Sequence, residues 1–289
     1  MTLRLGTLCL FENPSDEAGR ALIRQFVLVR EADRMGYDDI WLAERHGDAR
    51  HPSGAVTALL GHLAGVTSKA RIGAVLQPQG RDAAQLAEDL ATIELLSRGR
   101  LALAADAMDE VAAPAVDALA AVRDRIAARP ADLVPQPEAG ALPAWVLAQG
   151  EASVRHAAAR GLGLWLPPTL APQAVQALSA LYRDAAGPAS AAADPRMLLT
   201  RYACPRDTRE EALAIARPYL EARIGPREAD AALAQSLVGS HAEVAERIRR
   251  LGAELGLHGV VVVPMSAQFD TAKHILADMV DEVRPLLDD

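Results

Sequence analysis

Eight short apolar runs alternate along this chain with longer segments of helical periodicity, and no other feature constrains the fold as much. This is the pattern of strand–helix units wound around a parallel sheet, whose strands are buried on both faces. Eight such strands close a barrel, and 289 residues suffice for one barrel domain. The expected strands are Leu3–Leu10, Asp38–Leu42, Ala70–Leu76, Arg100–Ala105, Ala144–Ala148, Gly163–Leu166, Met197–Cys204 and Gly259–Pro264. We therefore predict a single α/β domain over residues 1–289, a (β/α)8 TIM barrel.

Capping residues predict where several helices begin and end. The expected helices are Glu17–Met35 with Asn13 and Ser15 as possible N-caps, Ser53–Thr67, Asp82–Ser97, His241–Leu255 behind a capping box of Ser240 and Glu243, and Asp270–Leu287 with Pro285 bending or ending it. Two segments interrupt this regularity. The proline-rich Arg129–Pro143 predicts a loop, and Ala185–Pro195, rich in Ala, Pro and Gly, predicts a mobile surface connection.

Composition excludes several classes of protein. A net charge of −8 without a long basic run, and an aromatic content of 3%, argue against nucleic-acid binding. No run of about 18 apolar residues and no secretory leader are present, so we expect no membrane partner and a cytoplasmic location. Cys9 and Cys204 are expected to be buried hydrophobic residues, and the histidines lack metal-ligand spacing, so no metal site is predicted.

Three segments carry a resemblance to a known family. Asp39–His46 (DIWLAERH), Thr67–Gly73 (TSKARIG) and Gln85–Arg100 (QLAEDLATIELLSRGR) are similar, in order and spacing, to the bacterial-luciferase-like flavin-dependent monooxygenases. The runs near Asp207–Ala212 and Val238–Ala245 resemble the C-terminal third of the same family. Gln85–Arg100 is the most specific of these segments.

The resemblance implies a barrel that binds reduced FMN and acts with O2 on a small organic substrate. A separate flavin reductase could supply the reduced FMN. The resemblance also implies a homodimer through the helices near Pro52–Thr67 and Ala84–Ser97, whose small and apolar residues suit close packing of two identical surfaces. The site would lie at the carboxyl ends of the strands, where barrel active sites are built.

Glu44 and His46 follow the second strand and are the candidate catalytic residues. An imidazole there could act as a general base because its pKa lies near neutrality. The family commonly has two adjacent histidines or a Glu-His pair at this point, whereas this chain has Arg45 in the first position. Equally, Glu44 and His46 could simply satisfy backbone groups at the end of the strand.

The turn at residues 149–153 is the candidate phosphate site. Gln149, Gly150 and Ser153 stand where the resemblance places the groups that hold the FMN phosphate, and a helix begins there. A helix N-terminus presents unpaired N–H groups and a partial positive charge, which suit a phosphate. Without the resemblance the same residues would be read as an ordinary capped helix, and an inward-facing Glu151 would repel the phosphate.

The run at residues 103–110 departs from the family, which has glycines and an arginine after strand four. Here Ala105 and Asp106 occupy the expected flavin-contacting positions, followed by Asp109 and Glu110. Alanine obstructs the close approach that glycine permits, and an acid raises the cost of binding a dianion. Arg81 could replace the missing cation or be a solvated surface residue, and Trp165 could cover a flavin edge or pack inside the barrel wall.

Three functions remain open at the sequence level. The first is an active FMN-dependent monooxygenase or oxidoreductase. The second is a degenerate, non-catalytic subunit that keeps the barrel but binds flavin weakly or not at all. The third is a deazaflavin-dependent dehydrogenase on the same fold, because a barrel does not choose its cofactor.

Overall fold

Eight parallel strands close a barrel in the computed structural model, which describes residues 3–107, 113–138, 140–191 and 196–287. The sheet order is β6-β5-β4-β3-β2-β1-β9-β7-β8, and β6 also pairs with β7, which closes the ring. The strands are β1 (Arg4–Cys9), β2 (Asp39–Ala43), β3 (Arg71–Leu76), β4 (Leu101–Ala107), β5 (Ala144–Ala148), β6 (Gly163–Leu166), β7 (Met197–Arg206), β8 (Leu237–Ser240) and β9 (Gly259–Pro264). All eight predicted strands are confirmed.

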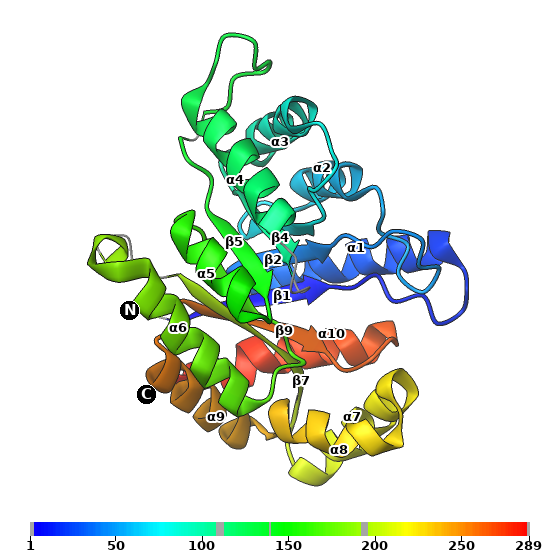
Figure 1. Cartoon of the computed structure of the whole chain (residues 1–289). Coiled ribbons are helices and arrows are strands. Elements are labelled where there is room, and N and C mark those ends of the chain that lie inside the picture. The colour runs from blue at the N-terminus through cyan, green and yellow to red at the C-terminus, as the bar shows by residue number, and fades with distance from the viewer. Residues whose placement is uncertain (1–2, 108–112, 139, 192–195, 288–289) are drawn as a thin grey trace.

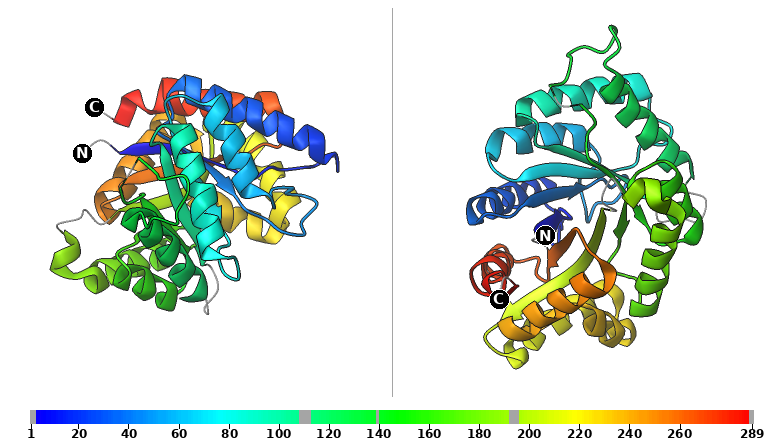
Figure 2. Two further views of the ribbon diagram at one scale, coloured as in Figure 1. Left: turned by 90° about the horizontal axis from the view of Figure 1, so that it is seen from above. Right: turned by 90° about the vertical axis from the view of Figure 1, so that its left-hand side faces the viewer.

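Helices cover the outside of the barrel, as the views in Figures 1 and 2 show. They are α1 (Ala18–Met35), α2 (Val56–Val66), α3 (Ala83–Ser97), α4 (Ala113–Ala128), α5 (Glu151–Ala159), α6 (Pro172–Ala191), α7 (Arg209–Ile224), α8 (Pro226–Gln235), α9 (His241–Leu255) and α10 (Phe269–Asp278). A π-helical turn (Met279–Val283) and a 3-10 turn (Pro285–Leu287) follow. Within the described residues, no helix is long and apolar enough to cross a membrane.

The predicted helix ends hold at some caps and fail at others. Asp82 caps α3 by accepting from the Gln85 N–H at 2.9 Å, and Ser240 and Glu243 form the capping box of α9. The helix expected from Ser53 begins only at Val56, because the Ser53 hydroxyl turns to the His51 carbonyl instead.

Three further elements differ from the sequence prediction. The expected connection at Ala185–Pro195 is wrong as far as residue 191, because α6 continues to Ala191; residues 192–195 lie outside the described residues. The strand β8 was not predicted, since it has only four residues and pairs only with the carboxyl end of β7. The last predicted helix is divided, with α10 ending at Asp278 before the π-helical turn.

All three tryptophans of the chain fill the barrel interior. Trp41 meets Trp145 edge to face with ring centroids 5.6 Å apart, and Trp165 with centroids 4.7 Å apart. Two glycines make this possible: a Cβ on Gly73 would lie 2.4 Å from the Trp41 ring, and one on Gly163 would lie 2.4 Å from the Trp145 ring. Trp165 is therefore a packed interior residue that donates to the Thr200 hydroxyl, and it does not cover a ligand.

Two of the segments that carry the family resemblance, Thr67–Gly73 and Gln85–Arg100, contribute to a scaffold at the amino ends of the strands. The buried Asp33 carboxylate at the end of α1 accepts the backbone N–H groups of Ser68, Lys69 and Ala70 at 2.8 to 2.9 Å. Arg100, just before β4, donates to the Thr67 hydroxyl and to the Thr67 and Ala70 carbonyls. These residues hold the β3 and β4 entrances together, on the face opposite to that of a barrel active site.

An ion-pair cluster lies at the same amino ends. The Asp39 carboxylate is 1% exposed and pairs with both Arg4 and Arg71. The Arg71 guanidinium also lies over the Trp145 ring, 4.9 Å from its centroid. Together with the packed tryptophans, this cluster leaves the carboxyl ends of the strands as the face where a ligand would meet the barrel.

Candidate functional site

The carboxyl ends of the parallel strands gather the predicted site residues at one rim. Glu44 and His46 follow β2, Gln77 follows β3, Asp106 lies at the end of β4, and Gly150 follows β5. All the strand pairs are parallel, so these residues share one end of the barrel. The predicted rim is confirmed, and we refer to it as the mouth.

Glu44 and His46 form a pair in which a buried carboxylate holds an exposed imidazole. The His46 Nε2 lies 3.0 Å from the Glu44 Oε1, and their side chains are 56% and 1% exposed. An ionised carboxylate can only accept, so Nε2 would donate to Glu44 and Nδ1 of a neutral imidazole would be left as the acceptor. His46 is therefore a potential base at the mouth, oriented by Glu44.

Two further donors compensate the buried charge of Glu44. The Gln77 backbone N–H donates to Oε2 at 2.6 Å, and Arg81 reaches Oε1 at 3.4 Å. Arg81 thus contacts an acid at the strand ends and is not simply a solvated surface residue. Buried within this set of donors, Glu44 positions His46 and the β3–α3 loop.

Arg45 and Asp106, the two departures from the family pattern, are partners. Their side chains pair at 2.9 Å across the mouth, with Arg45 34% and Asp106 15% exposed. The expectation of an uncompensated negative charge at Asp106 is therefore corrected, because the arginine that replaces a family histidine neutralises the acid that replaces the family's cation. A phosphate near this position would face an ion pair, which repels it far less than a bare carboxylate.

The β5–α5 turn contains the three residues predicted to hold a phosphate. Gly150 is the N-cap of α5 and makes no side-chain cap hydrogen bond, so the helix start is not closed by its own cap. Gln149 and Glu151 are exposed, whereas Ser153 is buried at 2% exposure. The exposed Glu151 is not held inside the turn. Gly150 is partly exposed, whereas Ser153 lies below the surface of the turn.

Ala105 lies in a different environment from Asp106. Its side chain is fully buried in the core that also contains Leu103 and Ala107, whereas Ala104 belongs to the interior cluster of the tryptophans. Only the backbone of Ala105 could therefore contact a ligand at the mouth. Asp109 and Glu110 lie outside the described residues.

A second polar contact at the mouth involves residues far apart in the sequence. The Tyr219 hydroxyl donates to the Glu12 Oε1 at 2.7 Å, and Arg223 pairs with the same oxygen. Burial, followed by the nearby Glu12 charge, raises the pKa of Tyr219 well above its ordinary value. Sequence reasoning missed this contact, which ties α7 to the β1–α1 loop, because no local motif joins positions more than 200 residues apart.

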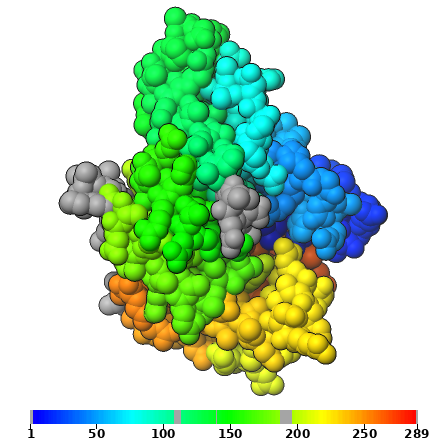
Figure 3. Space-filling view, viewed as in Figure 1, coloured from blue at the N-terminus to red at the C-terminus, as the bar shows by residue number. Residues whose placement is uncertain are grey.

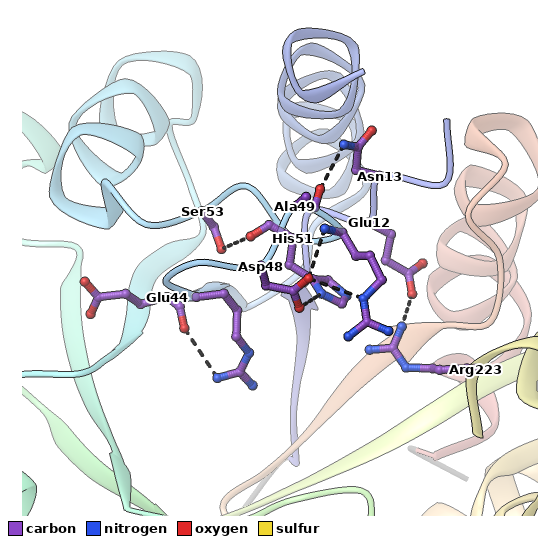
Figure 4. A network of polar contacts seen from close by, with 10 residues as sticks. Glu12, Asn13, Glu44, Asp48, Ala49, His51, Ser53 and Arg223 are labelled. Carbon is purple, nitrogen blue, oxygen red and sulfur yellow. Dashed lines mark hydrogen bonds and ion pairs between the residues drawn. The ribbon is translucent and has the colours of Figure 1, made fainter. Parts of the chain in front are cut away.

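Figure 4 shows this contact beside the loop that follows β2. Asn13 donates to the Ala49 carbonyl at 3.0 Å, and its own oxygen accepts the Glu17 N–H near the start of α1. In the same loop, His51 bonds Asp48 at 2.8 Å and lowers the pKa of that carboxyl to about 2. These bonds fix the loops after β1 and β2 relative to each other. In the described part of the chain, no three His, Cys, Asp or Glu side chains are arranged to hold a metal ion.

Comparison with known proteins gives a consistent result. The family model of luciferase-like monooxygenases matches residues 3–105 and 120–259. An uncharacterised protein of Bacillus subtilis, YvbT, is 38% identical over 78 residues, which are 26% of this chain and 23% of YvbT; the match thus spans less than a quarter of that relative.

Solved structures share the whole fold at low sequence identity. The monooxygenase RslO1 of Streptomyces bottropensis has a TM-score of 0.83 at 22% identity, covering 98% of this chain and 99% of its own. The oxygenating constituent of 3,6-diketocamphane monooxygenase of Pseudomonas putida, solved in complex with FMN, has a TM-score of 0.82 at 17% identity. The match covers 99% of this chain and 98% of that one. An F420-dependent secondary alcohol dehydrogenase has a TM-score of 0.73 at 16% identity, and the match covers all of both chains.

Proposed function

This chain belongs to the luciferase-like monooxygenase family, and on that premise we propose that it is an FMN-dependent monooxygenase acting with O2 on a small organic substrate. The observation that carries the proposal is the exposed His46 imidazole, oriented at the mouth by the buried Glu44. The relatives of known structure include one solved with FMN and one that uses F420, which supports a flavin-type cofactor.

The residues at the mouth fit such a cofactor. The start of α5 at Gly150, with no side-chain cap, offers helix N–H groups to the phosphate, and Asp106, which Arg45 neutralises, lies on the neighbouring strand β4. The packed tryptophans form the floor, so the cofactor and the substrate would bind above them. Reduced FMN would supply the electrons that activate O2.

His46 would move the proton. With Nε2 bonded to Glu44, Nδ1 can accept a proton from the substrate or return one to the product. His46→Gln should therefore lower kcat while leaving the affinity for FMN within about twofold, because His46 does not hold the phosphate. Equal losses of turnover and FMN binding would show instead that His46 is part of the cofactor cradle.

Titration with FMN and F420 separates an FMN-dependent monooxygenase from an F420-dependent dehydrogenase and from a non-catalytic subunit. We expect FMN to bind with one site per chain and F420 to bind more weakly, with oxygen uptake only when reduced FMN and a substrate are present. A protein that binds neither cofactor would be the non-catalytic subunit, and one that prefers F420 would be a dehydrogenase. A separate flavin reductase would be required if NADH or NADPH alone does not reduce the bound flavin.

We further propose a homodimer through α2 and α3. The eleven residues of α2 include no charged side chain, although Ala58, His62 and Gly65 are exposed, and Leu96 on α3 is 59% exposed. An uncharged outer helix beside an exposed leucine suits burial against a second copy. Light scattering of wild type should give twice the chain mass, and Ala58→Arg should give the monomer.

A further inference from the structure

A pocket on the side of the barrel, away from the mouth residues described above, is lined by three arginines. Arg201 comes from β7, and Arg247 and Arg250 come from α9. Gln176 on α6, Gln235 on α8 and Glu254 on α9 complete the polar lining, and the pocket holds about 180 Å3. It lies between α6 and α9, which are neighbours in Figures 1 and 3, where the chain surface runs from green to orange.

Arg201 is the unusual member of this group. It is 2% exposed, and its only hydrogen bonds within the described chain run from NH1 to the carbonyls of Thr200 and Pro167. No described carboxylate lies within ion-pair distance of it, although isolated buried charges are costly. The Nε and NH2 groups therefore remain for a ligand in the pocket.

Its two neighbours add charge, and neither forms an ion pair with a described carboxylate. Arg247 donates from its two terminal nitrogens to the carbonyls of Ser236 and Ala234, which leaves its charge unpaired, and no described side chain pairs with Arg250. Burial, and then repulsion by Arg247, lowers the pKa of Arg201 to about 10. In a chain of net charge −8, three such cations around one cavity are a local exception.

We propose that this pocket binds a small tetrahedral dianion, either inorganic phosphate or sulfate, or the phosphate of a small phosphomonoester. Guanidinium groups present paired N–H donors that match phosphate oxygens, and Gln176 and Gln235 can donate further bonds. The volume lies below the roughly 300 to 1,000 Å3 of pockets for drug-sized ligands, so the whole of FMN would not fit. The pocket is separate from the phosphate cradle proposed at Gly150, on which it does not depend.

The test is calorimetric titration with inorganic phosphate, sulfate and glycerol phosphate at constant ionic strength, on wild type and three variants of α9. Arg250→Glu should weaken phosphate binding about tenfold or more, and Glu254→Gln, which removes the one acid of the lining, should tighten it a few-fold. Arg249→Glu is the matched control, since Arg249 is exposed, pairs with Glu246 and does not line the pocket. Both Arg250 and Arg249 are exposed, so neither change threatens the fold.

Three outcomes separate the possibilities. Phosphate binding that persists with saturating FMN and is lost in Arg250→Glu supports the pocket, whether or not FMN itself binds. Tighter binding of glycerol phosphate than of inorganic phosphate identifies a phosphomonoester as the ligand, and the reverse identifies the free ion. Equal phosphate affinity in Arg250→Glu and Arg249→Glu, or no saturation by 10 mM phosphate (a limit of about 3 kcal/mol of binding), overturns the proposal.

Discussion

Breaking the Arg45–Asp106 pair in both directions tests how the chain compensates for its altered mouth. The two side chains meet at 2.9 Å and are about one third and one seventh exposed. Coulomb's law gives about 1.4 kcal/mol for this separation in water and about 6 kcal/mol at an effective dielectric constant of 20. Dehydration and lost side-chain freedom offset much of that, which leaves a coupling on the order of 1 to 2 kcal/mol.

Three variants test the effect of each charge on FMN affinity. Arg45→Ala exposes the Asp106 charge to the phosphate and should weaken FMN binding about five- to thirtyfold, which is the coupling expressed as an equilibrium ratio. Asp106→Asn releases the cation and should tighten binding by a few-fold. The double variant should return to within about threefold of wild type, because both charges are gone.

The assay is quenching of flavin fluorescence on titration, with urea unfolding of the same four proteins as a second cycle. The stability cycle should show the same coupling of about 1 to 2 kcal/mol without FMN. If Arg45→Ala and Asp106→Asn shift FMN affinity in the same direction, or if their effects on the free energy of unfolding simply add, the pair does not neutralise Asp106 and our reasoning is wrong.

Three other predictions concern the scaffold around the site. Glu44→Gln should cost about 2 to 4 kcal/mol of unfolding free energy in urea, since the Arg81 and His46 donors lose a buried charge; no loss would show that Glu44 is not needed there. Gly73→Ala should destabilise the barrel by about 2 kcal/mol or more, because its Cβ would clash with Trp41. Gly19→Ala, which has open space around it in α1, should be neutral or stabilising by up to about 1 kcal/mol. Equal urea unfolding midpoints for the two variants would refute the packing argument. Burial raises the pKa of Asp33, but the three backbone N–H bonds outweigh burial and lower that pKa. The ionised Asp33 therefore stabilises the fold above the unfolded pKa near 4, and this stabilisation is lost as the pH falls. The difference in unfolding free energy between wild type and Asp33→Asn should shrink from pH 5 to pH 2, and a constant difference would contradict this.

The strands were predictable because buried strands are continuous apolar runs in the sequence. Each barrel strand is apolar on both faces, and a short apolar run bounded by turn residues has few other interpretations. The strand β8 and the end of α6 were not, because four residues carry no periodicity and the Gly187-Pro188 pair inside α6 is typical of a helix end.

The site was predictable only in part. Glu44 and His46 are two residues apart, so a local pattern can place them together. Arg45 and Asp106 are 61 positions apart, and their pairing depends on the register of β2, β3 and β4, which no local pattern contains. Gln85–Arg100 identified the family, yet Arg100 serves the scaffold at the opposite end of the barrel, so recognising a motif did not reveal its role.

Anaerobic titration of the wild-type protein with reduced FMN tests the central claim most directly. We expect saturable binding of one FMN per chain, followed, after oxygen is admitted with a substrate, by oxygen uptake that His46→Gln slows without releasing the flavin. Absence of reduced FMN binding at concentrations up to about 1 mM, which corresponds to less than roughly 4 kcal/mol of binding free energy, would contradict the claim and leave a barrel that keeps the family fold without its cofactor.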